Sequence, residues 1–194
     1  MIFTVLSRRA LMASVGLAFS LLSVATFAQK SPQVKFVTSE GNFVVEVYPD
    51  KAPKTVENFL QYVKDKHYDG TIFHRVIDGF MVQGGGFAAD MREKTMRAPI
   101  PLEAGNGLKN DRGSIAMART SNPNSATAQF FINVKDNAML NAPSPDGYGY
   151  AAFGKIVSGM ETVDKIRLTA TGNKGQFQNV PVNPIVITSA TLAK

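Results

Sequence analysis

Apolar and polar residues alternate through several short segments of the chain, which is typical of β-strands with one buried face. Residues 33–38 and 43–48 alternate in this way on either side of Glu40-Gly41-Asn42, whose residues favour a tight turn. The two segments therefore predict a β-hairpin. Further strands are predicted at residues 71–77, 80–83, 113–118, 129–134, 150–157 and 184–192.

Glycine and proline indicate where several of these segments stop. Asp78-Gly79 predicts a turn between the strands 71–77 and 80–83, and the run Gly84-Gly85-Gly86 predicts the end of the second strand. Residues 88–112 show no sustained period and contain two prolines, so they predict a long ordered loop. Loops of this length within a compact domain usually have a binding role.

Two segments have the period of an amphipathic helix. Pro53 suits the first helical position, and the residues after it form one apolar stripe, so a helix is predicted to end before Asp69-Gly70. The stripe consists of Val56, Phe59, Leu60 and Val63. A second short helix is predicted at residues 160–168. Many strands, two helices and no β-α-β alternation predict a mainly β fold, in which an antiparallel sheet closes into a barrel or sandwich with helices over the open ends.

The first 28 residues have the order of regions of a secretory signal peptide. The basic segment Ser7-Arg8-Arg9 precedes an apolar run from Ala10 to Ala25, and cleavage is expected after Ala28, or alternatively after Ala25. A retained membrane anchor is the competing interpretation, but the run is shorter than the ~20 residues that a spanning helix needs. We therefore expect residues 29–194 to form one periplasmic domain without stable membrane association. Both the general secretory and the twin-arginine routes stay open.

Composition restricts the chemistry. The chain has no cysteine and two histidines, which excludes disulfides, thiolate metal sites and cysteine nucleophiles and disfavours a multi-histidine metal site. Nucleophile-elbow, zinc-protease and phosphate-loop motifs are also absent from the sequence. Removal of the two arginines within residues 1–28 lowers the formal net charge from +6 to +4, and the remaining basic residues are scattered. We therefore expect no nucleic-acid partner, no metal and no cofactor.

The segment from Phe73 to Gly85, FHRVIDGFMVQGG, resembles the signature of the cyclophilins. Three further fragments follow in the family's order, at residues 113–118, 129–132 and 150–155. The resemblance extends over nearly all of residues 33–192 and is strongest to periplasmic cyclophilins of Gram-negative bacteria. It implies a closed eight-stranded antiparallel β-barrel with two capping α-helices. It also implies peptidyl-prolyl cis/trans isomerase activity on unfolded or extended proline-containing polypeptides.

The resemblance assigns the central role to Arg75. Rotation about an X-Pro bond has a barrier of ~18–20 kcal/mol, because resonance gives the C–N bond double-bond character. Twisting localises the lone pair on the prolyl nitrogen, so a hydrogen-bond donor beside it stabilises the twisted state more than either planar state. By resemblance, the catalytic residues are Arg75, Gln83, Phe131 and Tyr150. The substrate-binding residues that it implies are Phe80, Met81, Ala118, Arg119, Gln129, Met139 and Leu140.

His74 is the obvious catalyst by residue type, but we predict a structural role. Adjacent residues in a strand point to opposite faces, so His74 should face inward if Arg75 faces a groove, and it should satisfy a buried hydrogen bond there. Three positions depart from the best-known eukaryotic members: Met139 replaces Trp, Tyr150 replaces His, and Arg119 replaces Asn. Tyr150 still provides a polar group at the groove edge. The loss of the indole predicts weak cyclosporin binding.

Two functions are compatible with such a barrel. The first is an isomerase that assists folding of exported proteins as a monomer. The alternative is a non-catalytic chaperone module that binds proline-containing peptides, which would keep the apolar pocket but would not need the arginine. The presence of Arg75, Gln83 and Phe131 together favours the isomerase.

Overall fold

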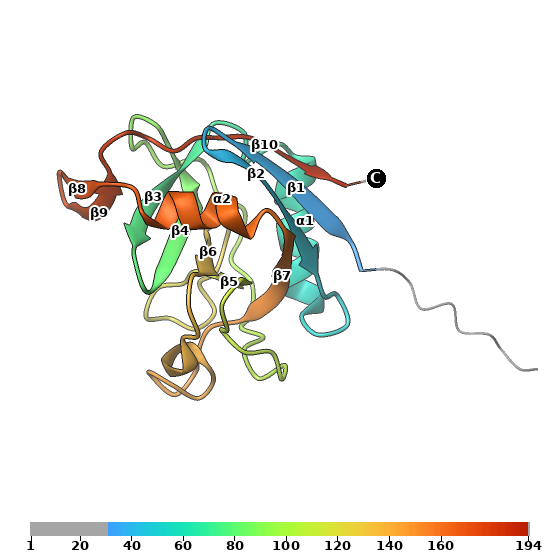
Figure 1. Cartoon of the computed structure of the whole chain (residues 1–194). Helices are drawn as coiled ribbons and strands as arrows, with labels where there is room; N and C mark the ends of the chain where they lie inside the picture. The colour runs from blue at the N-terminus through green and yellow to red at the C-terminus, as the bar shows by residue number, and fades with distance from the viewer. Residues whose placement is uncertain (1–30, 194) are drawn as a thin grey trace, which may run out of the picture.

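The computed structural model describes residues 31–193, so the predicted signal peptide lies outside the described residues (Figure 1). Eight strands form one antiparallel sheet in the order β10-β1-β2-β7-β5-β6-β4-β3. These strands are β1 (Gln33–Thr38), β2 (Gly41–Val47), β3 (Thr71–Ile77), β4 (Met81–Ala88), β5 (Ser114–Met117), β6 (Phe130–Asn133), β7 (Ala152–Ser158) and β10 (Ile187–Leu192).

The sheet curves until its two edge strands, β3 and β10, meet. Ile72 forms an isolated bridge with Val186, and the Phe73 N–H donates to the Ile185 carbonyl at 3.0 Å. The result is a nearly closed barrel, as predicted. Because almost every strand edge is paired in this arrangement, few backbone N–H and C=O groups remain exposed for pairing with another chain.

Phenylalanine rings fill the interior of the barrel. Phe36 stacks on Phe43 with 4.9 Å between ring centroids, and Phe59 packs against Phe153 at 5.1 Å. These four rings and that of Phe130 are each no more than 1% exposed. Large aromatic side chains bury much apolar surface at low conformational cost, so this cluster is a main source of stability.

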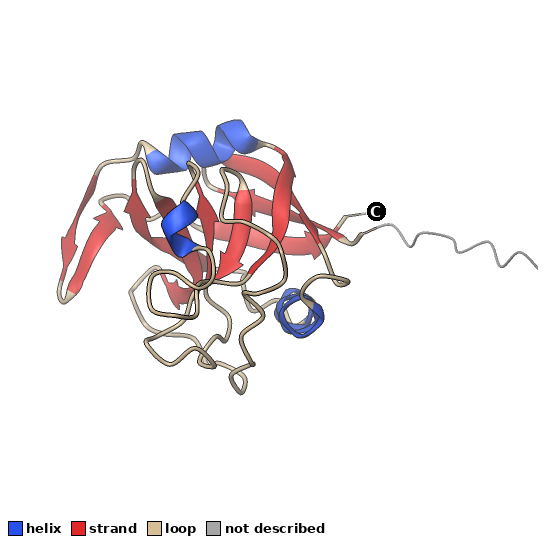
Figure 2. Cartoon of the chain, turned by 90° about the horizontal axis from the view of Figure 1, so that it is seen from below, coloured by secondary structure: helices blue, strands red, loops and turns tan. Residues whose placement is uncertain are grey.

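Two α-helices, α1 (Pro53–Lys64) and α2 (Met160–Arg167), cover opposite sides of the strands (Figure 2). The predicted stripe of α1 is confirmed, with Val56, Phe59 and Val63 buried and Leu60 partly buried. Within residues 31–193, no helix has the length and apolar character needed to cross a membrane.

The N-terminus of α1 is capped by a residue far away in sequence. The preceding residue, Ala52, has no side-chain hydrogen bond to offer. Glu103 provides the cap instead, because its carboxylate accepts hydrogen bonds from the backbone N–H groups of Lys54 at 3.1 Å and Thr55 at 2.8 Å. Glu103 belongs to the long loop predicted at residues 88–112, which contains no helix or named strand beyond Ala88. The cap therefore fixes this loop against the barrel.

The predicted end of the fourth strand was wrong. β4 continues through the glycine run to Ala88, because the glycines allow the strand to approach neighbouring side chains closely. Gly85 has a φ of +86°, and a Cβ atom there would lie 2.8 Å from the ring of Tyr68. The glycine run thus marks close packing and not a strand end.

Two further elements were not predicted. A short hairpin of β8 (Thr171–Lys174) and β9 (Phe177–Pro181) lies beside β3, outside the main sheet (Figure 1). All four residues of β8 are exposed, so this strand lacks the apolar alternation that predicts strands. The 3₁₀ helix η1 (Ala138–Leu140) is a single turn, which is too short to leave a period in the sequence.

Candidate active site

A cavity of about 100 Å³ lies on the outer face of the sheet. The sheet's alternation separates it from the core: Val82 and Ile132 point into the barrel, whereas their neighbours Met81 and Phe131 belong to a second apolar cluster. The residues that line the cavity are Arg75, Met81, Gln83, Ala118, Arg119, Phe131, Leu140 and Tyr150. Eight of the eleven site residues implied by the resemblance are thus brought together.

Strands β3, β4 and β6 place three of these residues in a row. Arg75 is paired with Gln83 across β3 and β4, and Gln83 is paired with Phe131 across β4 and β6. A register shift in β3 between Phe73 and Arg75 makes this possible. Phe73 packs in the barrel core while Arg75, two residues later, is exposed beside the cavity; strict alternation would put both on one face.

The guanidinium of Arg75 is free to bind a ligand. None of the ion pairs among residues 31–193 involves Arg75. Its expected partner Gln83 instead donates from Nε2 to Oε1 of Gln129 at 3.0 Å. The two amides therefore bind each other, and Arg75 lines the cavity without an ion-pair partner in the described residues.

His74 occupies the irregular position in β3. The predicted burial is confirmed, with 5% of the residue exposed, but its ring packs against Phe87 at 4.7 Å between centroids, and Phe87 packs against Phe177 of β9. The expected hydrogen bond is not made by Nδ1, which has no partner in the described part of the chain. Burial, reinforced by the charge of Arg75, lowers the pKa of His74 from 6.5 to about 4. The imidazole is therefore neutral at pH 7.

The opposite wall of the cavity comes from loops. Tyr150 donates its backbone N–H to the Leu140 carbonyl at 2.9 Å, and its ring packs against that of Phe131 with 5.7 Å between centroids. The side chain of Asn110 donates from Nδ2 to the carbonyls of Leu140 and Tyr150, each at 3.2 Å. One buried amide therefore holds together the two loop segments that face the strands.

Asn110 belongs to a buried polar network that sequence reasoning missed. Asn133 donates to Asn110 at 3.2 Å, and Asn137 donates to Asn133 at 2.7 Å and to the Phe80 carbonyl at 2.8 Å. All three asparagines are fully buried. Asparagine is common in exposed loops and turns, so a single sequence has no signal that identifies these three as buried supports.

Three residues implied by the resemblance lie outside the cavity lining. Gln129 lines a second cavity of about 330 Å³, which shares Gln83, Ala118 and Arg119 with the first. Phe80 is partly buried and packs against the apolar cluster that contains Met81 and Phe131. Met139, on η1, is 56% exposed. In the part of the chain that the structure describes, no three His, Asp or Glu residues are grouped so that they could hold a metal ion.

Comparison with known proteins gives a consistent result. Residues 33–192 match the family described as cyclophilin type peptidyl-prolyl cis-trans isomerase/CLD. A peptidyl-prolyl cis-trans isomerase of Streptomyces antibioticus is 58% identical over 161 residues, which is 82% of this chain and 97% of the relative. Isomerase A of Dickeya dadantii is 53% identical over 190 residues, which is 97% of this chain and 100% of the relative.

The fold comparison agrees with the sequence comparison. A crystal structure of a cyclophilin type peptidyl-prolyl cis-trans isomerase from Cryptosporidium parvum superposes with a TM-score of 0.70 at 28% identity. The match covers 84% of this chain and 98% of that one. Isomerase B of Escherichia coli is 53% identical over 163 residues, 83% of this chain and 99% of the relative.

Proposed function

The chain belongs to the cyclophilin-type peptidyl-prolyl cis-trans isomerases, and from this premise we propose that it rotates X-Pro bonds in the cavity beside Arg75. The observation that carries the proposal is the row of Arg75, Gln83 and Phe131 across three adjacent strands. This row places the Arg75 guanidinium beside a small cavity that has apolar side chains in its wall. A bond rotation needs little more than shape and one directed donor.

The cavity is suited to a prolyl ring. Its volume of about 100 Å³ is small, and Met81, Phe131 and Leu140 provide apolar walls. A bound ring fixes the prolyl side of the bond, so that the preceding carbonyl group is the part that rotates. A prolyl ring bound against these side chains displaces water from them, which strengthens any hydrogen bond made to the twisted bond.

Arg75 acts on the twisted bond. As the C–N bond rotates out of plane, resonance is lost and the prolyl nitrogen becomes a better hydrogen-bond acceptor. A guanidinium N–H that points at this nitrogen stabilises the twisted state and has little to bind in the planar states. Such a contact lowers the barrier without tightening substrate binding. Gln83, which is paired with Arg75 across β3 and β4 and donates to Gln129 at 3.0 Å, is expected to limit the positions that the arginine adopts.

The peptide on the N-terminal side of the proline is expected to lie along the second cavity. The two cavities share Gln83, Ala118 and Arg119, so a single extended chain can enter both. The N–H of Ala118 already donates to the Gln129 carbonyl at 3.0 Å. Pairing with a substrate backbone must therefore use the Ala118 carbonyl or the main chain of Arg119.

We further propose that the protein is exported to the periplasm, where it assists the folding of other exported proteins. The order of basic, apolar and small residues within residues 1–28 supports export. Fractionation of cells that express the full chain, followed by N-terminal sequencing of the periplasmic form, tests this proposal. The expected first residue is Gln29. A full-length protein that stays with the membrane would contradict it.

The isomerase proposal is tested by exchange spectroscopy on a short X-Pro peptide with the purified protein at catalytic amounts. We expect faster cis/trans exchange, and we expect a metal chelator to leave the rate unchanged. Substrate-induced signal changes should concentrate on Met81, Phe131 and Leu140. Exchange acceleration with signal changes at another surface would contradict the proposed site.

A further inference from the structure

The side chain of Arg119 is buried, in contrast to that of Arg75. Only 1% of it is exposed, although the residue as a whole is partly exposed through its main chain. A buried guanidinium is destabilising unless protein groups accept its hydrogen bonds. Each of its three nitrogens donates to a protein oxygen: Nε to Gly149 O at 3.0 Å, Nη1 to Thr120 O at 2.9 Å and Nη2 to Gly149 O at 2.8 Å. The buried side chain thus joins the backbone of Thr120 to that of Gly149.

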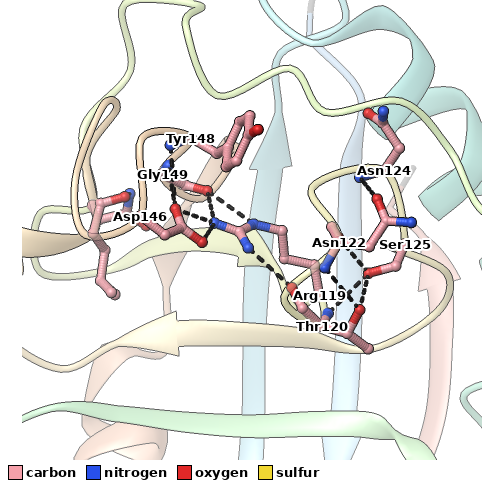
Figure 3. Close-up of polar contacts among 10 residues, drawn as sticks. Arg119, Thr120, Asn122, Asn124, Ser125, Asp146, Tyr148 and Gly149 are labelled. Atoms are coloured by element: carbon pink, nitrogen blue, oxygen red, sulfur yellow. Dashed lines mark hydrogen bonds and ion pairs between the residues drawn. The ribbon is translucent and has the colours of Figure 1, made fainter.

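Asp146 completes this arrangement from an exposed loop (Figure 3). Its carboxylate oxygens accept hydrogen bonds from Nη2 of Arg119 at 2.7 and 2.8 Å, and Oδ1 also accepts the backbone N–H of Tyr148 at 3.2 Å. Residues 142–148 are exposed, so few packing contacts are available to hold them. The hydrogen bonds from Arg119 keep the pKa of Asp146 below its ordinary value, so the carboxylate is charged at neutral pH.

The residues that follow Arg119 in the chain are also held by hydrogen bonds. Thr120 donates from Oγ1 to Oγ of Ser125 at 2.8 Å, and Ser125 donates from the same oxygen to the Asn122 carbonyl at 2.7 Å (Figure 3). Arg119 therefore connects two loops, residues 119–125 and residues 146–149, each of which is closed by its own hydrogen bonds.

Arg119, Asp146 and Gly149 are joined by these hydrogen bonds, and we call the three residues the clamp. Tyr150 directly follows Gly149 in the chain. The Cζ atom of Arg119 lies 4.4 Å from the centroid of the Tyr150 ring, and the same ring contacts Phe131 edge to face. Tyr150 and Phe131 both line the small cavity. The guanidinium therefore packs against one of the two aromatic rings that line the cavity.

We propose that Arg119 is a positioning residue, which together with Asp146 and Gly149 holds the Tyr150 ring at the cavity edge and thereby sets how tightly the substrate's prolyl residue is bound. The inference rests on the proposed active site and deepens it, because it assigns substrate affinity to a side chain that does not itself contact substrate. Prolyl contacts with the cavity walls are similar in planar and twisted states. Loss of the clamp should therefore raise KM and leave kcat nearly unchanged.

The central test measures KM and kcat separately for Arg119→Met, which keeps an unbranched apolar stem in place of the arginine's and removes its donors. We expect KM to rise about tenfold while kcat changes less than about twofold. Asp146→Asn should raise KM by about threefold, because the amide retains an acceptor oxygen but loses the charge. The double variant should be no worse than Arg119→Met alone, since both changes break one connection.

Arg119→Lys distinguishes the effect of the hydrogen bonds made by Arg119 from the effect of its positive charge. Lysine keeps the positive charge but cannot donate to Asp146, Gly149 and Thr120 at once, so we expect KM to stay raised. A wild-type KM for Arg119→Lys would overturn the proposal. An unchanged KM in Asp146→Asn combined with a raised KM in Arg119→Met would also overturn it, because that pattern indicates direct contact between the arginine and substrate.

A readout independent of activity reports on the ring itself. The chain has five tyrosines, so the protein labelled with 3-fluorotyrosine gives few ¹⁹F signals, and the one missing from Tyr150→Phe belongs to Tyr150. We expect this signal to shift in Arg119→Met and in Asp146→Asn. Arg97→Met is the matched control, because it breaks the exposed ion pair between Arg97 and Asp65 and should leave the signal in place.

If Arg119→Met does not fold, the KM and the ¹⁹F signal of Asp146→Asn, in which the altered carboxylate lies at the surface, test the positioning role instead. Arg75→Ala in the same assay tests the underlying site: if that variant keeps its turnover, the proposed active site is wrong. If Arg75→Ala loses turnover while Arg119→Met keeps a wild-type KM and an unmoved Tyr150 signal, only the positioning role of Arg119 is wrong.

Discussion

The small cavity has two walls that are held in place by different forces. Strands β3, β4 and β6 form one wall, where backbone pairing fixes Arg75, Gln83 and Phe131 in a row. Loops form the other wall, where the side chain of Asn110 binds the carbonyls of Leu140 and Tyr150 and that of Arg119 binds the carbonyl of Gly149. A strand ladder distributes its hydrogen bonds over many residues, whereas a loop held by one side chain depends on that residue.

This difference predicts that the two walls contribute to different kinetic constants. Arg75, the group proposed to act on the rotating bond, lies on the wall whose geometry tolerates little change, as a directed donor requires. The groups that complete the binding pocket sit on the wall that single substitutions can alter. Changes in the strand wall should therefore affect kcat, and changes in the loop wall should affect KM.

The largest effect is expected for Arg75→Ala. Removal of one preorganised donor to a transition state typically costs ~3–4 kcal/mol, roughly two to three powers of ten in kcat. The fold should be unaffected, because Arg75 is exposed and takes part in no ion pair among the described residues. Kinetics and circular dichroism on the same preparation check both points. The kcat of Arg75→Lys should lie between those of the wild type and Arg75→Ala. A folded Arg75→Ala with wild-type kcat would contradict the assignment of kcat to the strand wall.

Acid should destabilise the strand wall through His74. Its pKa is about 4 in the folded protein and ~6.5 in an unfolded chain. The unfolded state therefore binds the proton more readily, so stability is full above pH ~6.5 and falls as the pH drops toward 4. The expected loss is ~3 kcal/mol in the free energy of unfolding.

Urea unfolding of the wild type and of His74→Phe between pH 7 and pH 4 measures this loss. Phenylalanine can keep the contact with Phe87 and cannot titrate, so the variant should lose less stability over this range. The slope that remains should reflect His67, whose pKa is lowered mainly by burial, and, toward pH 4, Asp146 and Asp164, whose pKa values are lowered mainly by hydrogen bonds from Arg119 and Arg112. Equal slopes for the two proteins would show that His74 is not the group responsible.

A smaller effect is expected for Asn110→Ala in the loop wall. The substitution removes a buried amide that donates to the carbonyls of Leu140 and Tyr150 and accepts from Asn133, which should cost ~2 kcal/mol of stability. KM should rise while kcat is retained by the folded fraction. Asn183→Ala, at an exposed loop position, is the control and should change neither quantity. A fall in kcat at constant KM would contradict the assignment of binding to the loops.

The smallest effect is expected for Met139→Trp. Met139 is 56% exposed and adjoins Leu140, which lines the cavity. An indole at this edge offers a flat apolar face and an N–H donor, so cyclosporin should bind about tenfold tighter, ~1.4 kcal/mol. Peptide turnover should change little. Tight binding of cyclosporin by the wild type, or no gain from the tryptophan, would show that this edge contributes little to inhibitor binding.

Much of the fold was predictable from local pattern. The helix predicted at residues 160–168 is observed as Met160–Arg167, and the strand predicted at 129–134 is observed as Phe130–Asn133. The failures have different causes. β4 continues through Gly85 because glycine leaves room for the ring of Tyr68, a contact that local pattern does not show. β8 pairs with the next strand in the chain, β9, but its exposed residues lack the apolar alternation that predicts a strand.

The site was predictable only in part. The resemblance implied the eleven site residues, and the structure brings eight of them around one cavity. Periodicity alone would have put Phe73 and Arg75 on the same face, and the register shift in β3 reverses this. The supporting residues Asn110 and Asp146 carried no recognisable signal, since their roles come from what they contact and not from their type.

The sequence by itself determined the alternation of strands, the apolar stripe of α1, the exclusion of cysteine chemistry and the family likeness around Arg75. These features rest on interactions within a few residues or on residue identity alone. Only the tertiary structure decided that Glu103 caps a helix 49 residues away and that Arg119 is buried against Asp146, 27 residues away. A buried charge or an open helix end is satisfied by whichever group the chain brings nearest in space, and local sequence does not specify that group.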